Sequence, residues 1–260
     1  MKNTKKILAV VLAAAMILVC FAGCTKKADE AKTLVMATNA EFPPYEFKEG
    51  DKVVGIDAEV MQAICDKIGY TLKIEDMAFD SIIPAVQSGK ADVGAAGMTI
   101  TNERKQEVDF TDTYATAKQV VIVREDAKIT SIDDLAGKKV GVQQGTTGDI
   151  YASDSVENGG FGEENVDKYS KGAEAVTALT QNKVSAVIID NQPAQVFVKN
   201  ANEGGNVKLV ILDEAFADEE YAICVKKGNT ELLDKINKAL AELKADGTFD
   251  KIVGKYISAK

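Results

Sequence analysis

The sequence contains no histidine among its 260 residues. Histidine is the commonest general base and zinc ligand, and the usual partner of a catalytic serine or cysteine. Its absence excludes the enzyme mechanisms and zinc sites that depend on histidine. Two glycine-containing segments differ from nucleotide-binding motifs. Gln143–Gly148 lacks the Gly-Lys-Ser/Thr ending of a phosphate-binding loop, and Gly94–Gly97 falls short of a dinucleotide-binding fingerprint. We therefore expect no catalytic residue, no cofactor and no metal.

Cysteine is also scarce, with four residues in the chain, and only Cys65 and Cys224 follow Cys24. Both lie in apolar segments, so we expect buried free thiols. A disulfide between them stays open at this point, since pairing depends on a geometry that the sequence does not contain.

Only one long apolar run is present, from Ile7 to Ala22, and it follows Lys2, Lys5 and Lys6. Its 16 residues fall short of the roughly 20 that span a bilayer as a helix. This plan predicts a signal peptide over residues 1–23. The ending Phe21–Cys24 resembles the bacterial lipobox, so we expect a lipid, palmitate included, on Cys24 and a lipidated tether over residues 24–31. The alternative is ordinary secretion with Cys24 as a plain thiol.

The sequence has fewer basic than acidic residues. Without the three lysines of residues 1–23, 28 basic residues face 40 acidic ones, a net charge of −12. Such a balance argues against a nucleic-acid partner. An apolar content of 46% suits a globular protein with one large or two modest domains.

Short apolar runs alternate with helical periodicity from Thr33 onward, which predicts an α/β protein with largely parallel sheets. One helix is expected from Asp57 to Ile68, with Asp57 as its cap and Gly69 as its stop. Segments 84–90 and 177–183 resemble each other, each a helix end and a turn before a strand, which suggests two lobes of related topology. The expected strands are Thr33–Thr38, Thr71–Glu75, Ala91–Ala95, Lys118–Val123, Lys138–Val142, Val184–Ile189, Val207–Leu212 and Tyr221–Val225.

Polar residues follow several of these strands. Ligands of open α/β sheets bind beyond the carboxyl ends of parallel strands. A free amino acid needs a fixed cation and a fixed anion, and Arg104 and Asp190 could be that pair. Each has a plainer interpretation: Arg104 as a solvated helix start, and Asp190 as an N-cap. The other candidates at or near strand ends are Asn39, Phe42, Phe79, Ala96, Gly97, Thr99, Gln143 and Thr147.

Several motifs occur together in one order, and residues 33–256 resemble the family-three solute-binding proteins. Gly55–Val60 followed by Ile64 is similar to that family's signature, with Ala58 as a small departure. The other matching segments are Phe42–Phe47, Ile83–Ala85, Gly97–Thr101 with Glu103-Arg104, and Gln144–Thr147.

This resemblance implies a two-lobed periplasmic-binding-protein-like fold of type II. Each lobe would be a mostly parallel sheet flanked by helices, and two hinge strands would join the lobes. We expect lobe 1 over residues 32–116 plus 220–260 and lobe 2 over residues 117–219. The lobes would close on one amino acid and dock on the permease of an ABC importer. We expect a monomer outside the cytoplasm, anchored to the membrane through Cys24.

The resemblance also assigns roles within the candidate site. Arg104 would hold the ligand carboxylate and Asp190 its ammonium. Thr99 and Thr147 would add further contacts. The ligand side chain would lie between the rings at positions 42 and 79 and meet the selectivity positions 39 and 143.

Asn39 is the informative departure, because related binding proteins for glutamine or cationic amino acids often carry aspartate there. Its neutral side chain favours a polar uncharged ligand over a basic one, although Glu41, Glu46 or Glu219 could supply the negative charge instead. Two other functions use the same fold: an exported enzyme resembling cyclohexadienyl dehydratase, and an amino-acid sensor domain.

Overall fold

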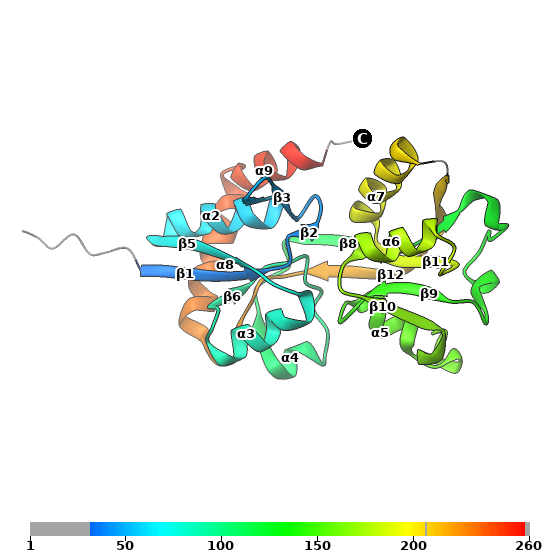
Figure 1. Cartoon of the computed structure of the whole chain (residues 1–260). Coiled ribbons are helices and arrows are strands. Elements are labelled where there is room, and N and C mark those ends of the chain that lie inside the picture. Colours follow the sequence, from blue (N-terminus) through cyan, green and yellow to red (C-terminus); the bar gives the residue numbers. More distant parts are fainter. Residues whose placement is uncertain (1–31, 206, 258–260) are drawn as a thin grey trace, which may run out of the picture. The chain divides into compact units, whose positions relative to one another are not determined.

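The computed structural model describes residues 32–205 and 207–257, and within them two five-stranded sheets form the centres of two lobes (Figure 1). The expected signal peptide, the tether and the lipidation site Cys24 lie outside the described residues. Among the residues described, no helix has both the length and the apolar character needed to cross a membrane.

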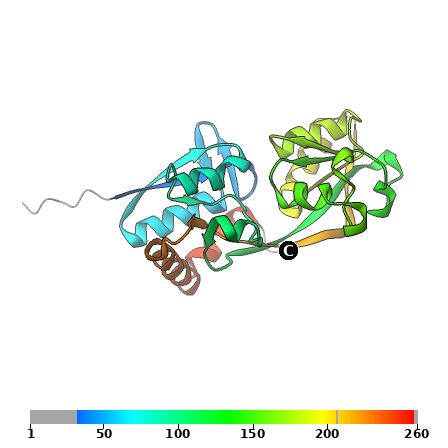
Figure 2. The same ribbon diagram turned by 90° about the horizontal axis from the view of Figure 1, so that it is seen from below.

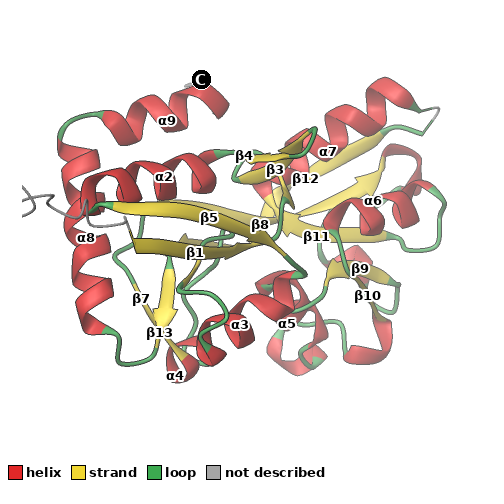
Figure 3. Cartoon of the chain, turned by 60° about the vertical axis from the view of Figure 1, so that its left-hand side comes forward, coloured by secondary structure: helices red, strands yellow, loops and turns green. Residues whose placement is uncertain are grey.

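The first lobe is built on a sheet with the strand order β5-β1-β6-β13-β7. Strands β1 and β6 are parallel, whereas β13 runs antiparallel to both of its neighbours. The strands are β1 Lys32–Thr38, β5 Tyr70–Asp76, β6 Val93–Gly94, β7 Val108–Phe110 and β13 Cys224–Lys226. Helices α2, α8 and α9 pack together on one side of this sheet, and α3 and α4 lie on the other (Figure 3). These helices are α2 Ile56–Ile68, α3 Ile82–Ser88, α4 Arg104–Glu107, α8 Thr230–Ala245 and α9 Thr248–Tyr256.

Helix α2 begins one residue earlier than expected, and Asp57 is not its cap. The helix follows Gly55, and its first backbone N–H groups donate to Pro44 O at 3.1 Å and Tyr45 O at 2.9 Å. These carbonyls accept hydrogen bonds from N–H groups that would otherwise need a capping side chain as acceptor. The carboxylate of Asp57 is thereby free to point into the lobe. At the other end the helix stops at Gly69 in the left-handed conformation, as predicted.

A small three-stranded sheet brings the chain back against the start of α2. Its strands are β2 Glu41–Phe42, β3 Glu46–Glu49 and β4 Lys52–Val54. The contact is close at Gly55, which has φ +121° and where a Cβ would lie 2.3 Å from Tyr45 O. Only glycine allows this approach. The approach sets β3 and Glu46 beside the first turn of α2.

The second lobe is built on a sheet with the order β10-β9-β11-β8-β12. Strands β10, β9 and β11 are parallel, and β8 runs antiparallel to β11 and β12. Helices α6 and α7 pack on one side of the sheet and α5 on the other (Figure 1). The elements are β8 Ala115–Arg124, β9 Val140–Gln143, β10 Val166–Tyr169, β11 Ala186–Asp190, β12 Leu209–Tyr221, α5 Thr147–Ser153, α6 Gly172–Thr180 and α7 Asn191–Gly204. Short 3-10 turns occur at Phe79–Ser81, Glu125–Ala127, Asp133–Leu135, Val156–Asn158 and Glu163–Asn165.

Two long antiparallel strands, β8 and β12, connect the lobes (Figure 2). The expected strand Tyr221–Val225 is present as β13, which begins at Cys224. The expected end of the preceding strand at Leu212 was wrong, because β12 continues to Tyr221. Its acidic stretch has a low strand propensity, but pairing with β8 supplies its backbone hydrogen bonds and outweighs that propensity. The two hinge strands and the two-lobed fold are confirmed. The expected lobe boundaries at residues 116–117 and 219–220 stay predictions.

The predicted helix–turn–strand repeats are present in both lobes. Helix α3 ends at the left-handed Gly89 ahead of β6, and α6 ends before the turn that leads to β11. Cys65 and Cys224 are both free and fully buried. This confirms the expected thiols and excludes a disulfide between them.

Candidate ligand-binding site

Chain segments that follow the central strands of both sheets converge on one cavity. Asn39 follows β1, Gln143 ends β9 and Asp190 ends β11. All ten residues proposed from the sequence line this cavity, together with Glu46 and Thr146. They are Asn39, Phe42, Phe79, Ala96, Gly97, Thr99, Arg104, Gln143, Thr147 and Asp190. Residues from the two lobes therefore surround one space.

The cavity is narrow in this arrangement of the lobes. Its volume is about 10 Å³, which is room for about one water molecule. An amino acid is many times larger. A ligand of that size does not fit into the cavity as this structure has it.

Arg104 is the first residue of the short helix α4, and only 7% of it is exposed. The interpretation as a solvated helix start was wrong. Its guanidinium donates to Thr99 O at 2.7 Å and to Gly145 O, in the other lobe, at 3.0 Å. The guanidinium carbon lies 5.4 Å from the centre of the Phe79 ring. Burial lowers the pKa of Arg104, and Glu219 opposes this effect. A buried guanidinium with few counter-charges is suited to hold a carboxylate.

Asp190 occupies the N-cap position of α7, but its side chain makes no capping hydrogen bond. Instead the Tyr221 hydroxyl donates to Oδ1, and Gln119 Nε2 donates to Oδ2 at 2.8 Å. Burial raises the pKa of Asp190 to about 7, and the nearby Glu219 also raises it. A buried carboxyl with a raised pKa gains much from a cation, because a cation favours its charged form.

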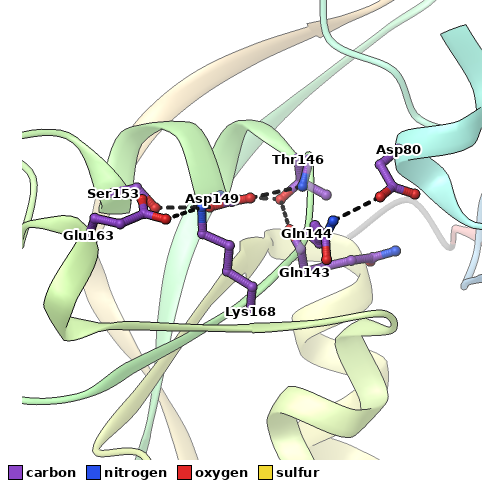
Figure 4. Close-up of polar contacts among 9 residues, drawn as sticks. Asp80, Gln143, Gln144, Thr146, Asp149, Ser153, Glu163 and Lys168 are labelled. Carbon is purple, nitrogen blue, oxygen red and sulfur yellow. Dashed lines mark hydrogen bonds and ion pairs between the residues drawn. The ribbon is translucent and has the colours of Figure 1, made fainter. Parts of the chain in front are cut away.

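The lobes contact each other directly around the cavity. Gln143 Nε2 donates to Asn39 Oδ1 at 2.9 Å, so the two expected selectivity positions bind each other. Gln144 Nε2 donates to Asp80 Oδ2 at 2.9 Å, as Figure 4 shows. A bound ligand between positions 39 and 143 would have to replace their mutual hydrogen bond.

An ion pair adds a further contact between the lobes. Lys171 Nζ lies 2.6 Å from Glu41 Oε1. Both side chains are partly exposed, so the pair contributes at most about 1 kcal/mol. Glu41 is thus already paired, and it is not among the residues that line the cavity. It is a poorer source of negative charge for a ligand than the buried Glu46.

The loop from β9 to α5 leads to Thr147, which lines the cavity. Hydrogen bonds within this loop are shown in Figure 4. Thr146 Oγ1 donates to Gln143 O at 2.8 Å and accepts from Asp149 N at 3.3 Å, which caps α5. Asp149 Oδ2 accepts from Gly145 N at 2.9 Å, and Lys168 Nζ lies 3.1 Å from Asp149 Oδ1. These contacts stiffen the loop before any ligand arrives.

The two rings at the cavity come from different elements of the first lobe. Phe42 ends β2 and is 7% exposed, while Phe79 begins a 3-10 turn and is partly buried. Gly97 has φ +52°, and a Cβ there would lie 2.9 Å from Phe42 Cε1. Glycine at position 97 therefore lets the backbone pass directly beside the ring.

Sequence reasoning missed Thr146, which lines the cavity, and it missed Gln119 and Asp57, which bind residues that line it. Gln119 lies fully buried in β8 and donates to both Asp190 and Thr147. A polar residue directly before the apolar run of positions 120–123, within the same expected strand, was the available signal. The role of Asp57 had no local signal, because its partners Gly97 and Tyr114 are 40 and 57 residues away. Within residues 32–205 and 207–257, no group of three His, Cys, Asp or Glu side chains could hold a metal ion.

The fold and the cavity define a two-lobed α/β binding protein with a buried cation and a buried carboxyl at one site. Residues 34–259 match the model of the bacterial extracellular solute-binding proteins, family 3, and the chain belongs to that family. Its relatives include the arginine-binding extracellular protein ArtP of Bacillus subtilis (strain 168), which is 34% identical over 229 residues, 88% of each chain.

Solved structures of similar proteins agree with this assignment. An ancestral arginine-binding protein bound to arginine is 45% identical, with a TM-score of 0.79, covering 87% of this chain and 98% of the other. The same values hold for an ancestral arginine-binding protein bound to glutamine. The two-lobed binding-protein fold is thereby established.

Proposed function

We propose that this protein captures a free cationic amino acid, arginine above all, outside the cytoplasmic membrane and delivers it to an ABC importer. The observation that carries the proposal is the pair Arg104 and Asp190, which are buried at one cavity and come from different lobes. A zwitterion places an anion and a cation a few bonds apart, and this pair matches both.

The side-chain preference rests on Glu46 and on the relatives. Glu46 lines the cavity and is fully buried, so its carboxyl can meet the end of a ligand side chain away from water. The relative from Bacillus subtilis and both solved structures are named as arginine-binding proteins, and one of the two structures contains glutamine in place of arginine. These observations favour a basic ligand over the uncharged one that Asn39 suggested. An uncharged amide such as glutamine is the second choice.

Binding proceeds by closure. In the open state the guanidinium of Arg104 takes the ligand carboxylate, and Asp190 then takes the ammonium. The side chain enters between Phe42 and Phe79, and the ligand replaces the direct Gln143–Asn39 bond with bonds to both partners. A ligand that contacts both lobes stabilises the closed state through its differential affinity. Micromolar affinity needs about −8 kcal/mol, which one desolvated ion pair at each end and ring packing can supply.

The location follows from the amino terminus. Cleavage before Cys24 and its lipidation would tether the protein to the outer face of the membrane as a monomer, within reach of the permease. No bond of the ligand needs to change, so we expect no turnover.

Isothermal titration calorimetry of the purified protein against arginine, lysine, histidine, glutamine and cystine tests the proposal. We expect arginine to bind with a micromolar or lower dissociation constant and glutamine more weakly. Binding of none of these amino acids, or turnover of prephenate or arogenate, would contradict the proposed function.

A further inference from the structure

Glu46 lines the cavity, and the carboxyl group of Asp57 lies beside it. Glu46, on β3, and Asp57, in the first turn of α2, are 0% and 1% exposed. Asp57 Oδ2 accepts hydrogen bonds from Gly97 N at 2.8 Å and from the Tyr114 hydroxyl at 2.7 Å. Among the described residues, no N–H or O–H group donates a hydrogen bond to Asp57 Oδ1 or to either oxygen of Glu46.

Such a pair holds a proton. Two desolvated carboxylates without a cation between them cannot both be charged, because burial and mutual repulsion each disfavour the second charge. Asp57 keeps its charge more easily because two donors stabilise it, and its pKa is raised by burial only to about 6. Burial and the neighbouring Asp57 raise the pKa of Glu46 well above its ordinary value. The proton of this pair therefore belongs on Glu46, and Asp57 keeps its charge.

The other titratable groups around Glu46 keep the proton in place. Asp190, at the end of β11, adds negative charge that further disfavours ionised Glu46. The hydroxyls of Tyr45, beside β3, and Tyr114, before β8, have raised pKa values through burial and nearby carboxylates, so both stay neutral. Arg104, from α4, lines the same cavity but donates to Thr99 and Gly145. No cation thus contacts Glu46 within the part of the chain that the structure describes.

We propose that Glu46 is protonated in the ligand-free protein and loses this proton to solvent when a cationic ligand side chain reaches it, so that arginine binding is coupled to proton release. The proposal rests on the proposed function, a cationic amino acid in this cavity. One O–H bond of Glu46 breaks, the proton goes to the buffer, and the guanidinium remains charged beside the new carboxylate. Asp57 stays ionised throughout.

The consequence is a ligand preference that depends on pH. Each proton released makes the affinity rise by up to about tenfold per pH unit. A neutral amide or urea side chain instead meets a protonated carboxyl, which can donate a hydrogen bond to its carbonyl oxygen. Lower pH therefore favours neutral ligands, and higher pH favours arginine.

Calorimetry with arginine and citrulline separates this proton from the others. Citrulline has nearly the shape of arginine, and it keeps the ammonium and carboxylate but has no side-chain charge. Titrations at about pH 7.5 in phosphate and in Tris, whose ionisation enthalpies differ, give the number of protons released per ligand. Asp190 meets the ammonium of both ligands, so its contribution cancels in the difference. We expect arginine to release about one proton more than citrulline.

Two variants assign that proton. Glu46→Gln should abolish the difference in proton release between the two ligands, and it should weaken the binding of arginine more than that of citrulline. Glu49→Gln, an exposed position on the same strand, should leave the difference unchanged. If either titration is too weak to measure, infrared difference spectroscopy decides: arginine added to the wild-type protein should remove the band of a protonated carboxyl.

The outcomes are distinct. Arginine binding with the proton count of citrulline, or with no loss of a protonated-carboxyl band, overturns the coupling and leaves the proposed function standing. An undiminished difference in Glu46→Gln likewise overturns the assignment to Glu46. If no amino acid binds at all, the proposed function fails, and this inference fails with it.

Discussion

Replacing Arg104 with alanine tests the proposed site most directly. The guanidinium is 7% exposed and has two backbone carbonyls as partners, one in each lobe. In the closed complex its removal would leave the ligand carboxylate buried without its counter-charge. Removing one partner of such a desolvated pair costs about 2–5 kcal/mol. At about 1.4 kcal/mol per tenfold, the dissociation constant for arginine should rise by about 30-fold to several thousand-fold.

The assay is calorimetry with arginine and with agmatine, which is arginine without its carboxylate. The wild-type protein should strongly prefer arginine, and Arg104→Ala should lose most of that preference. Arg104→Lys keeps the charge but loses the bidentate geometry, so it should fall between the two. Arg124 is the only other arginine in the chain and pairs with Asp126 at the surface, so Arg124→Ala is the matched control. If Arg104→Ala still distinguished arginine from agmatine as well as the wild-type protein does, the carboxylate would bind elsewhere.

Three further expectations concern charge and backbone geometry. Asp190→Asn should weaken arginine binding at least tenfold by calorimetry, because the ammonium loses its only proposed counter-ion; unchanged affinity would remove Asp190 from the site. The ligand-free protein should lose stability, by up to about 4 kcal/mol, as the pH rises from about 4 to about 7. The reason is that folding raises the pKa of Asp190 from 3.8 to about 7, so the folded state retains a proton that the unfolded state has lost; thermal unfolding should show a smaller decline in Asp190→Asn, and an equal decline would exclude this cause. Gly55→Ala should destabilise the protein by about 1–3 kcal/mol more than Gly69→Ala, because both have positive φ but only at Gly55 would the Cβ meet backbone, Tyr45 O at 2.3 Å; equal melting temperatures would contradict this close contact.

Local sequence patterns predicted much of the fold. The spacing of Val60 and Ile64 predicted the buried face of α2, and Gly69 predicted its end. The strand ends predicted which chain segments would meet, because parallel strands bring their carboxyl ends to one edge. The ten candidate residues follow from this rule together with the family resemblance. All of them line the cavity, although their contact with a ligand stays a prediction.

Other features depended on partners far away in the chain. Asp57 is a residue type that often caps helices, but here the backbone carbonyls of residues 44 and 45 accept from the first N–H groups of α2. The Asp57 carboxylate accepts from Gly97 N instead. The acidic end of β12 is a strand only because β8 lies beside it. No window of sequence contains both members of these pairs.

The sequence alone determined which classes of function the composition excludes, where strands and helices alternate, and which types of side chain stand at the strand ends. Each of these depends on neighbours within a turn or a strand. Tertiary structure alone decided that Arg104 and Asp190 are buried and that Asn39 and Gln143 bind each other across the lobes. It also decided that no donor among the described residues bonds to the carboxyl group of Glu46. Burial and charge pairing are properties of groups that meet in space, and they set the pKa of each group and the energy of each contact.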